Sequence, residues 1–152
     1  MTSRKRELID LEDRAWAEFR SLIDGMTPDQ LGEVGYYQDW SIKDLMAHLG
    51  CWMAEAARVL EQLRSGSYSS WDHDVEELNR EWWETWRDID LETVWSELYA
   101  ARSRMLDEWD RIPVDRLDEV ADLWFRESGH EHHDDHLPRL REWAAELTGT
   151  SS

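Results

Sequence analysis

The clearest indication of the fold is the segment Trp40-Ser-Ile-Lys-Asp-Leu-Met-Ala-His-Leu-Gly-Cys-Trp52. Ser41 and Asp44 form a variant of the capping box, in which the serine accepts from the Asp44 N–H while the carboxylate reaches back to the serine. From there to about Arg64, apolar residues recur at three- and four-residue steps. These are Leu45, Leu49, Trp52, Ala56, Val59 and Leu63. The pattern predicts a helix that buries one face.

Similar patterns occur on both sides of this helix. They predict a helix over 3–25, a helical turn from Thr27, further helices over 74–87 and 90–113, and a final helix that begins between 123 and 130 and ends near 147. No segment has the alternation of a strand. We therefore predict an all-α protein with one domain over residues 1–152, a four-helix bundle with one long crossover between helices two and three. The short break at 88–90 predicts that the helices beside it are antiparallel neighbours.

Charge and composition exclude several classes of function. The 152 residues carry a formal net charge of −18, which disfavours binding to nucleic acid or to an anionic membrane surface. Cys51 is the only cysteine, so no intrachain disulfide can form and a reducing compartment is expected. There is neither a signal-peptide pattern nor a long apolar segment. We expect a cytoplasmic protein that acts on a small molecule.

Histidines suggest a metal site. Four of the six lie in Gly129-His-Glu-His-His-Asp-Asp-His136, where His132 and His136 are four residues apart and so share one helix face. Two such imidazoles can bind one metal ion, and His48, on the inner half of the helix after Trp40, is the best candidate for a third ligand. The alternatives are a hydrogen-bonded core histidine and a solvated helix start. His130 and His133 are expected beside the site or exposed.

Aromatic residues supply the candidate pocket. Most of the 11 tryptophans are expected in the core, on or beside the inward stripes: Trp16, Trp52, Trp82, Trp86, Trp95 and Trp109. Trp71, Trp83 and Trp124 fit the stripes less well and are candidates for a pocket or a subunit contact. We expect the pocket wall near His48 to comprise Tyr36, Tyr37, Trp40 and Trp52. Glu55 is a candidate proton acceptor.

The chain resembles the DinB-like superfamily. Residues 40–49 resemble the signature that opens its second helix, residues 131–136 resemble its C-terminal His-x-x-x-His, and 77–80 and 90–94 are similar to the ClbS/DfsB branch. The resemblance implies a bundle with helices up, down, down and up, and a tendency to form homodimers. It also implies a site for zinc, nickel or a similar divalent ion with the ligands His48, His132 and His136.

For function, the resemblance implies a metal-dependent hydrolase or thiol S-transferase that acts on small reactive electrophiles, in detoxification or self-resistance. The cosubstrate would be a low-molecular-weight thiol such as mycothiol or bacillithiol. A negatively charged thiol would need a local basic patch, for which Lys43, Arg139 and Arg141 are candidates. The alternatives are a non-catalytic bundle that binds and sequesters a small molecule, and a self-associating stress protein. Pro138 is expected to kink the last helix or weaken its hydrogen bonding.

Overall fold

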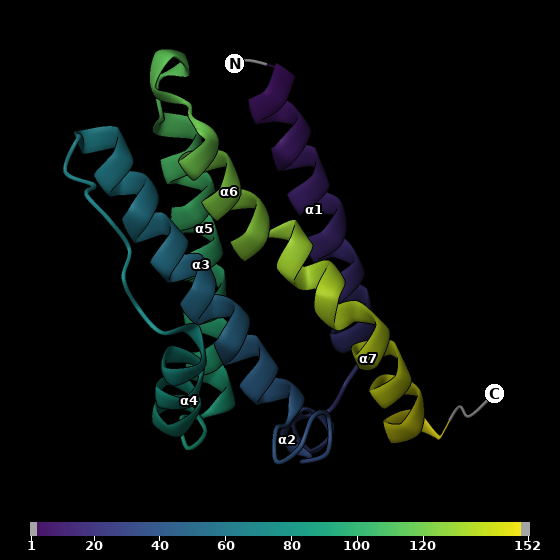
Figure 1. The fold of residues 1–152 in the computed structure, drawn as a ribbon. Helices are drawn as coiled ribbons and strands as arrows, with labels where there is room; N and C mark the ends of the chain where they lie inside the picture. Colours follow the sequence, from purple (N-terminus) through teal and green to yellow (C-terminus); the bar gives the residue numbers. More distant parts are fainter. Residues whose placement is uncertain (1–2, 150–152) are drawn as a thin grey trace.

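The computed structural model describes residues 3–149, and its regular elements are helices. In chain order they are α1 (Ser3–Ile23), α2 (Pro28–Gly32), α3 (Ile42–Ser65), α4 (Val75–Trp86), α5 (Leu91–Arg111), the 3-10 turn η1 (Val114–Arg116), α6 (Glu119–Ser128) and α7 (His130–Thr148). Figure 1 shows them arranged as an elongated helical bundle. The prediction of an all-α bundle is confirmed.

Local hydrogen bonds explain where α3 begins. The Asp44 N–H donates to Ser41 Oγ over 3.2 Å, and the Ser41 N–H donates to Asp44 Oδ2 over 2.9 Å. This capping box satisfies N–H groups that have no partner within the helix. Carboxylates accept from the first turns of α4, α5 and α6 in the same way. These caps are Asp74, Asp90 and Asp118.

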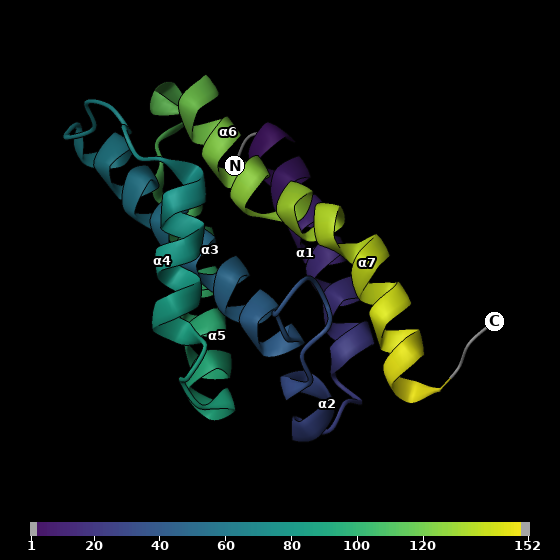
Figure 2. The ribbon, with the colours of Figure 1, turned by 60° about the horizontal axis from the view of Figure 1, so that its bottom comes forward.

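The long helices enclose one apolar core. α3 packs most extensively on α5, α1 packs on α7, and α6 closes over α3 (Figures 1 and 2). α4 packs mainly on α3, from the outside of the bundle (Figure 2). The main partner of α4 is therefore α3. Trp86 of α4 nevertheless lines a small void together with Val94 and Leu98 of α5, and the antiparallel pairing of residues 74–87 and 90–113 stays a prediction. The Lys43 ammonium contributes to this placement, because it donates to the carbonyls of Arg87 and Ile89 just after α4.

Gly129 separates α6 from α7. A Cβ at this position would lie 2.7 Å from Glu12 Oε1 and 2.7 Å from the Phe125 carbonyl oxygen, so only glycine allows this close approach of α1. α7 begins at His130, inside the predicted interval, and contains Pro138 within its length. The helix nevertheless continues to Thr148.

The tryptophans divide between the core and its edge. Trp16 and Trp109 are buried, as predicted. The other four tryptophans that we expected in the core are only partly buried: Trp52, Trp82, Trp86 and Trp95. Within residues 3–149, no helix is both long and apolar enough to cross a membrane.

Candidate metal centre and cavity

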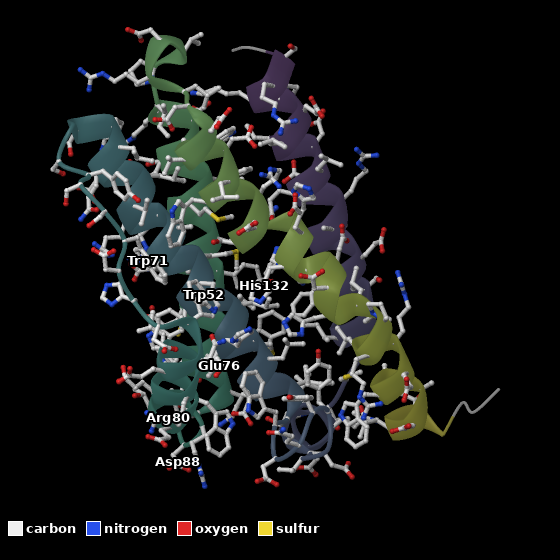
Figure 3. All side chains as sticks on the ribbon, viewed as in Figure 1. Trp52, Trp71, Glu76, Arg80, Asp88 and His132 are labelled. Atoms are coloured by element: carbon white, nitrogen blue, oxygen red, sulfur yellow. The ribbon has the colours of Figure 1, made fainter. Side chains whose placement is uncertain are left out.

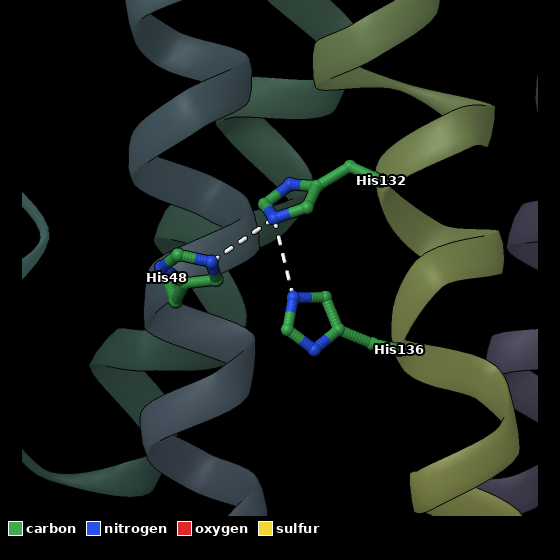
Figure 4. A group of neighbouring side chains, drawn as sticks. All are labelled: His48, His132 and His136. Carbon is green, nitrogen blue, oxygen red and sulfur yellow. Dashed lines mark hydrogen bonds between the residues drawn. The ribbon is translucent and has the colours of Figure 1, made fainter. Parts of the chain in front are cut away.

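Three imidazoles meet between α3 and α7. Figure 4 shows His48 of α3 facing His132 and His136 of α7. His132 Nε2 lies 3.0 Å from His48 Nε2 and 3.2 Å from His136 Nε2. A set of ligand atoms from the three rings lies within 4.8 Å of one another. The helical spacing of four residues brings the α7 pair to one face, and the packing of α7 beside α3 supplies the third ring.

Hydrogen bonding does not account for this convergence. One imidazole nitrogen offers either a single N–H or a single lone pair, so His132 Nε2 cannot satisfy both neighbours at once. Burial and the neighbouring His136 ring lower the pKa of His48 to about 3. Burial and the charges of the other rings lower the pKa of His132 to about 2, and burial also lowers that of His136. The rings are therefore neutral near pH 7, the form that binds metal ions.

The spacing also fits a shared ion. Nitrogen ligands about 2.0–2.1 Å from one tetrahedral ion lie about 3.3 Å apart, close to the observed separations of 3.0 and 3.2 Å. The three residues could thus hold a divalent metal ion, as the spacing of the histidines suggested.

Tyr36 orients one of these rings. Its hydroxyl oxygen lies 2.8 Å from His136 Nδ1, and the tautomer protonated at Nδ1 donates to it while leaving the Nε2 lone pair for the cluster. Burial raises the pKa of Tyr36 to about 12, so the hydroxyl stays protonated. The Nδ1 atoms of His48 and His132 are buried and have no hydrogen-bond partner among residues 3–149. Tyr36 therefore gives His136 a hydrogen-bond partner that His48 and His132 lack.

The loop that carries Tyr36 is fastened to α7. Arg139 donates to the carbonyl oxygens of Tyr36, over 2.6 Å, and of Gly35, over 2.9 Å. Gly35 has a φ of +135°, and a Cβ there would lie 2.6 Å from the Trp143 ring. Both the backbone conformation and the close ring thus favour glycine. Two residues of α7, Arg139 and Trp143, fix the position of Tyr36 relative to His136.

A cavity of about 530 Å³ opens beside the histidines, a size typical of small-molecule sites. His48 and His132 form one end of it. The remaining wall is largely aromatic and apolar, and is formed by Trp52, Tyr68, Trp71, Val75, Val120, Leu123 and Trp124. Three further polar side chains complete it, those of Asn79, Glu127 and Ser128. Figure 3 shows Trp52, Trp71 and His132 close together in the middle of the view. A ligand in this cavity can touch the imidazoles.

The predicted pocket wall differs from the observed one. Of the four residues proposed for it, only Trp52 lines this cavity. Tyr36 is buried against His136, Tyr37 is 55% exposed, and Trp40 packs edge-on against the His48 ring at 5.1 Å. The loop before α3 therefore contacts the histidine rings without lining the cavity. Residues of α6 and of the segment between α3 and α4 line the cavity in its place.

Trp71 and Trp124 do line the cavity, one of the two roles that the sequence suggested for them, whereas Trp83 does not. Trp83 instead borders a small void beside Trp40 and His48. Sequence reasoning missed Asn79, Glu127 and Ser128. The only available signal was that Glu127 and Ser128 follow Trp124 at three- and four-residue steps.

Glu55 is not placed as a proton acceptor. It is not among the residues that line the cavity with His48. Its carboxylate pairs with Arg58 and accepts from Trp71 Nε1 over 3.3 Å. The residue holds a cavity tryptophan in position, and the expectation of a chemical role is not supported.

The expected basic patch does not form at the cavity either. Lys43 caps the end of α4, as described above, and Arg139 holds the Tyr36 loop. Arg141 pairs with Glu18 over 2.8 Å. All three side chains bind groups of the protein itself and hold its helices and loops in place.

A buried ionic cluster lies behind the site. His133 Nε2 is 3.0 Å from Glu12 Oε1, and neither side chain is exposed. Arg102 of α5 donates to Glu12 Oε2 over 2.7 Å. Burial alone raises the pKa of the Glu12 carboxyl, but His133 and Arg102 outweigh it and lower the pKa below its usual value. His133 is thus a core residue beside the ligands, and the alternative of an exposed side chain is wrong.

Cys51 offers no competing chemistry. Burial and the nearby Glu97 raise the pKa of its thiol to about 12, so almost none of it is in the reactive thiolate form near pH 7.

Comparison with known proteins identifies the family. The family model described as "Mycothiol maleylpyruvate isomerase N-terminal domain" matches residues 13–130, well over half of the chain. The match includes His48 but ends before His132 and His136, so these two ligands rest on the geometry above. No curated protein and no solved structure matches the chain. The chain belongs to the mycothiol maleylpyruvate isomerase N-terminal domain family, a part of the DinB-like superfamily.

Proposed function

We propose that the protein is a metal-dependent enzyme, a thiol S-transferase or a hydrolase, that acts on small reactive electrophiles. The observation that carries the proposal is the convergence of three neutral imidazoles, two of which line an aromatic cavity, with 3.0 and 3.2 Å between neighbouring Nε2 atoms. The ion is proposed to be zinc or nickel, with His48, His132 and His136 as ligands, because imidazole suits both.

A divalent ion held by His48, His132 and His136 would activate a water or a thiol by lowering its pKa. The chain itself supplies orientation. Tyr36 sets the tautomer of His136, and the edge of Trp40 limits rotation of the His48 ring. Trp52, Trp71 and Trp124 line the cavity and would give the electrophile an apolar surface to pack against.

The family description supports the choice of a thiol. It names mycothiol, a low-molecular-weight thiol, and a sulfur nucleophile would form a bond to the electrophilic carbon as the leaving group departs. Water would do the same in a hydrolase. A role in detoxification or self-resistance follows if the electrophile is toxic. The ClbS/DfsB branch, the up-down-down-up order and the homodimer stay predictions.

The first test is elemental analysis of the protein as purified. We expect about one zinc or nickel ion per chain, loss of the ion in His48→Ala and His132→Ala, and retention in His73→Ala, which alters an exposed histidine outside the cluster. Absence of metal, together with no uptake when zinc or nickel is titrated in, would remove the mechanism.

The second test is a conjugation screen. Metal-loaded protein is mixed with mycothiol or bacillithiol and a panel of small electrophiles, and loss of free thiol is followed with time. We expect turnover that disappears in His48→Ala.

The alternative is a non-catalytic module that sequesters a small molecule in the same cavity. The aromatic wall of the cavity favours this alternative, because it can bind a ligand without any reaction. Ligand binding that is unchanged in His48→Ala, with no turnover in the parent protein for any thiol or for water, would favour this alternative over the enzyme.

A further inference from the structure

The wall of the cavity contains no lysine or arginine among the residues that the structure describes. Its one carboxylate is Glu127, an exposed residue of α6 that has no ion-pair partner within residues 3–149. The three basic residues expected to form a patch are engaged elsewhere, since Lys43 and Arg139 bind backbone carbonyls and Arg141 pairs with Glu18. An anionic group away from the histidines would therefore be buried without a counter-charge, which is costly.

Three indoles, those of Trp52, Trp71 and Trp124, form part of the cavity wall. Trp71 lies 5.9 Å from Trp52 with the rings inclined by 48°, and 5.1 Å from Trp124 with the rings inclined by 70°. The rings are thus tilted or edge-on to one another, and all three line the cavity. A positive charge over an indole face is attracted by the negative face of the ring.

The indole N–H groups of two of these rings are already used. Trp52 Nε1 donates to Asn79 Oδ1 over 2.8 Å, and Trp71 Nε1 donates to Glu55 Oε1 over 3.3 Å. The Glu55 carboxylate is itself held by Arg58. These hydrogen bonds fix the ring orientations in advance and leave ring carbons to contact a ligand, so the aromatic surface is pre-organised.

We propose that this cavity takes a small organic cation, with a quaternary or tertiary ammonium group against Trp52, Trp71 and Trp124 and near Glu127. The other end of the molecule would then face His48 and His132. The assignment of that end as the reacting one rests on the proposed function, whereas recognition of the cation needs no metal. The net charge of −18 favours the approach of such a ligand.

A matched pair of probes tests the charge directly. Choline and its uncharged isostere 3,3-dimethylbutan-1-ol have nearly the same shape, and their dissociation constants are measured by calorimetry and by quenching of tryptophan fluorescence. We expect choline to bind about tenfold more tightly than the isostere, a difference of about 1.4 kcal/mol, because only choline can make a cation–π contact with the indoles. Acetate, the anionic probe, should show no measurable binding at this surface of the metal-free protein.

Variants locate the site. Trp124→Leu and Glu127→Gln should each weaken choline binding several-fold. The affinity for the uncharged isostere should change little in Glu127→Gln. The control is Glu119→Gln, which removes an exposed carboxylate from the same helix outside this cavity. It should leave choline binding as in the parent.

The His48→Ala variant separates this inference from the proposed function. Choline binding that persists in His48→Ala and in metal-free protein supports a cation site, whatever the metal analysis shows. Equal affinity for choline and its isostere, tighter binding of acetate, or absence of choline binding would each overturn the proposal. So would an equal effect of Glu119→Gln and Glu127→Gln.

Discussion

Glu12 of α1 and His133 of α7 meet in the core, with 3.0 Å between Oε1 and Nε2 and no exposed surface on either side chain. The contact joins the first helix to the last, and His133 is the immediate neighbour of the proposed ligand His132. Arg102 of α5 completes the cluster. Charged groups at this depth are tolerated only because each has a partner.

Glu12→Gln should therefore destabilise the protein. The amide keeps the shape but removes the charge that faces His133 and Arg102, and we expect a loss of about 2–4 kcal/mol in the free energy of unfolding. This corresponds to a fall in Tm of roughly 5–15 °C for a chain of this size. The measurement is thermal and urea unfolding followed by circular dichroism.

Asp13→Asn is the matched control for Glu12→Gln. Asp13 binds the same Arg102 but its side chain is 60% exposed, so its loss should cost less than about 0.5 kcal/mol. Equal effects of the two variants would contradict the assignment of Glu12 as a buried structural charge.

Metal-free protein should lose stability as the pH falls from about 6.5. A histidine in an unfolded chain titrates near pH 6.5, whereas the folded chain lowers the pKa of His48 to about 3 and of His132 to about 2. The unfolded state thus binds more protons in this range. The free energy of unfolding should fall by up to about 1.4 kcal/mol per pH unit for each ring.

The pH prediction is checked by urea unfolding between pH 7 and pH 5 in the presence of a chelator, above the range in which Glu12 titrates. His48→Gln, which removes one titrating ring, should show a shallower dependence on pH. A free energy of unfolding that stays constant across this range would show that the three rings are not buried in their neutral form.

Tyr36→Phe should weaken metal binding more than it weakens folding. The variant removes the hydroxyl that lies 2.8 Å from His136 Nδ1 and keeps the buried ring. Loss of such a partner typically lowers metal affinity about 10- to 100-fold. Competition with a chromophoric chelator measures the affinity, and thermal unfolding of the metal-free protein measures the fold.

The control for Tyr36→Phe is Tyr37→Phe, which removes the hydroxyl of a tyrosine that is 55% exposed. It should change neither quantity by more than the experimental error. If the two variants bind metal equally well, Tyr36 does not orient the ligand.

Gly35→Ala should displace the Tyr36 loop. The alanine would have to adopt a φ of +135° with its Cβ 2.6 Å from the Trp143 ring, and we expect a cost of about 1–3 kcal/mol. Because the loop carries Tyr36, metal affinity should fall as well. Gly32→Ala is the comparison, since a Cβ there meets nothing within 4 Å, and unfolding and metal titration of both variants provide the measurement.

Features that depend on neighbours within about four residues can be predicted from the amino-acid sequence. The Ser41 and Asp44 cap, the apolar stripes of the long helices and the shared face of His132 and His136 are local, because hydrogen bonds and helical periodicity act over a single turn. These features predicted the all-α bundle and two of the three proposed ligands. His48 was placed as the third by its position on the inner face of its helix, together with the family resemblance.

Which residues meet across the bundle depends instead on how the helices pack. His48 and His132 are 84 positions apart, and their 3.0 Å separation depends on how α7 packs beside α3. Glu12 is one of 35 acids in the chain, and nothing in its local sequence distinguishes the one that is fully buried. The cavity wall was misplaced for the same reason. Which aromatic residues cover an open side is set by the path of the crossover and by the angle between helices, and these are properties of packing between distant segments.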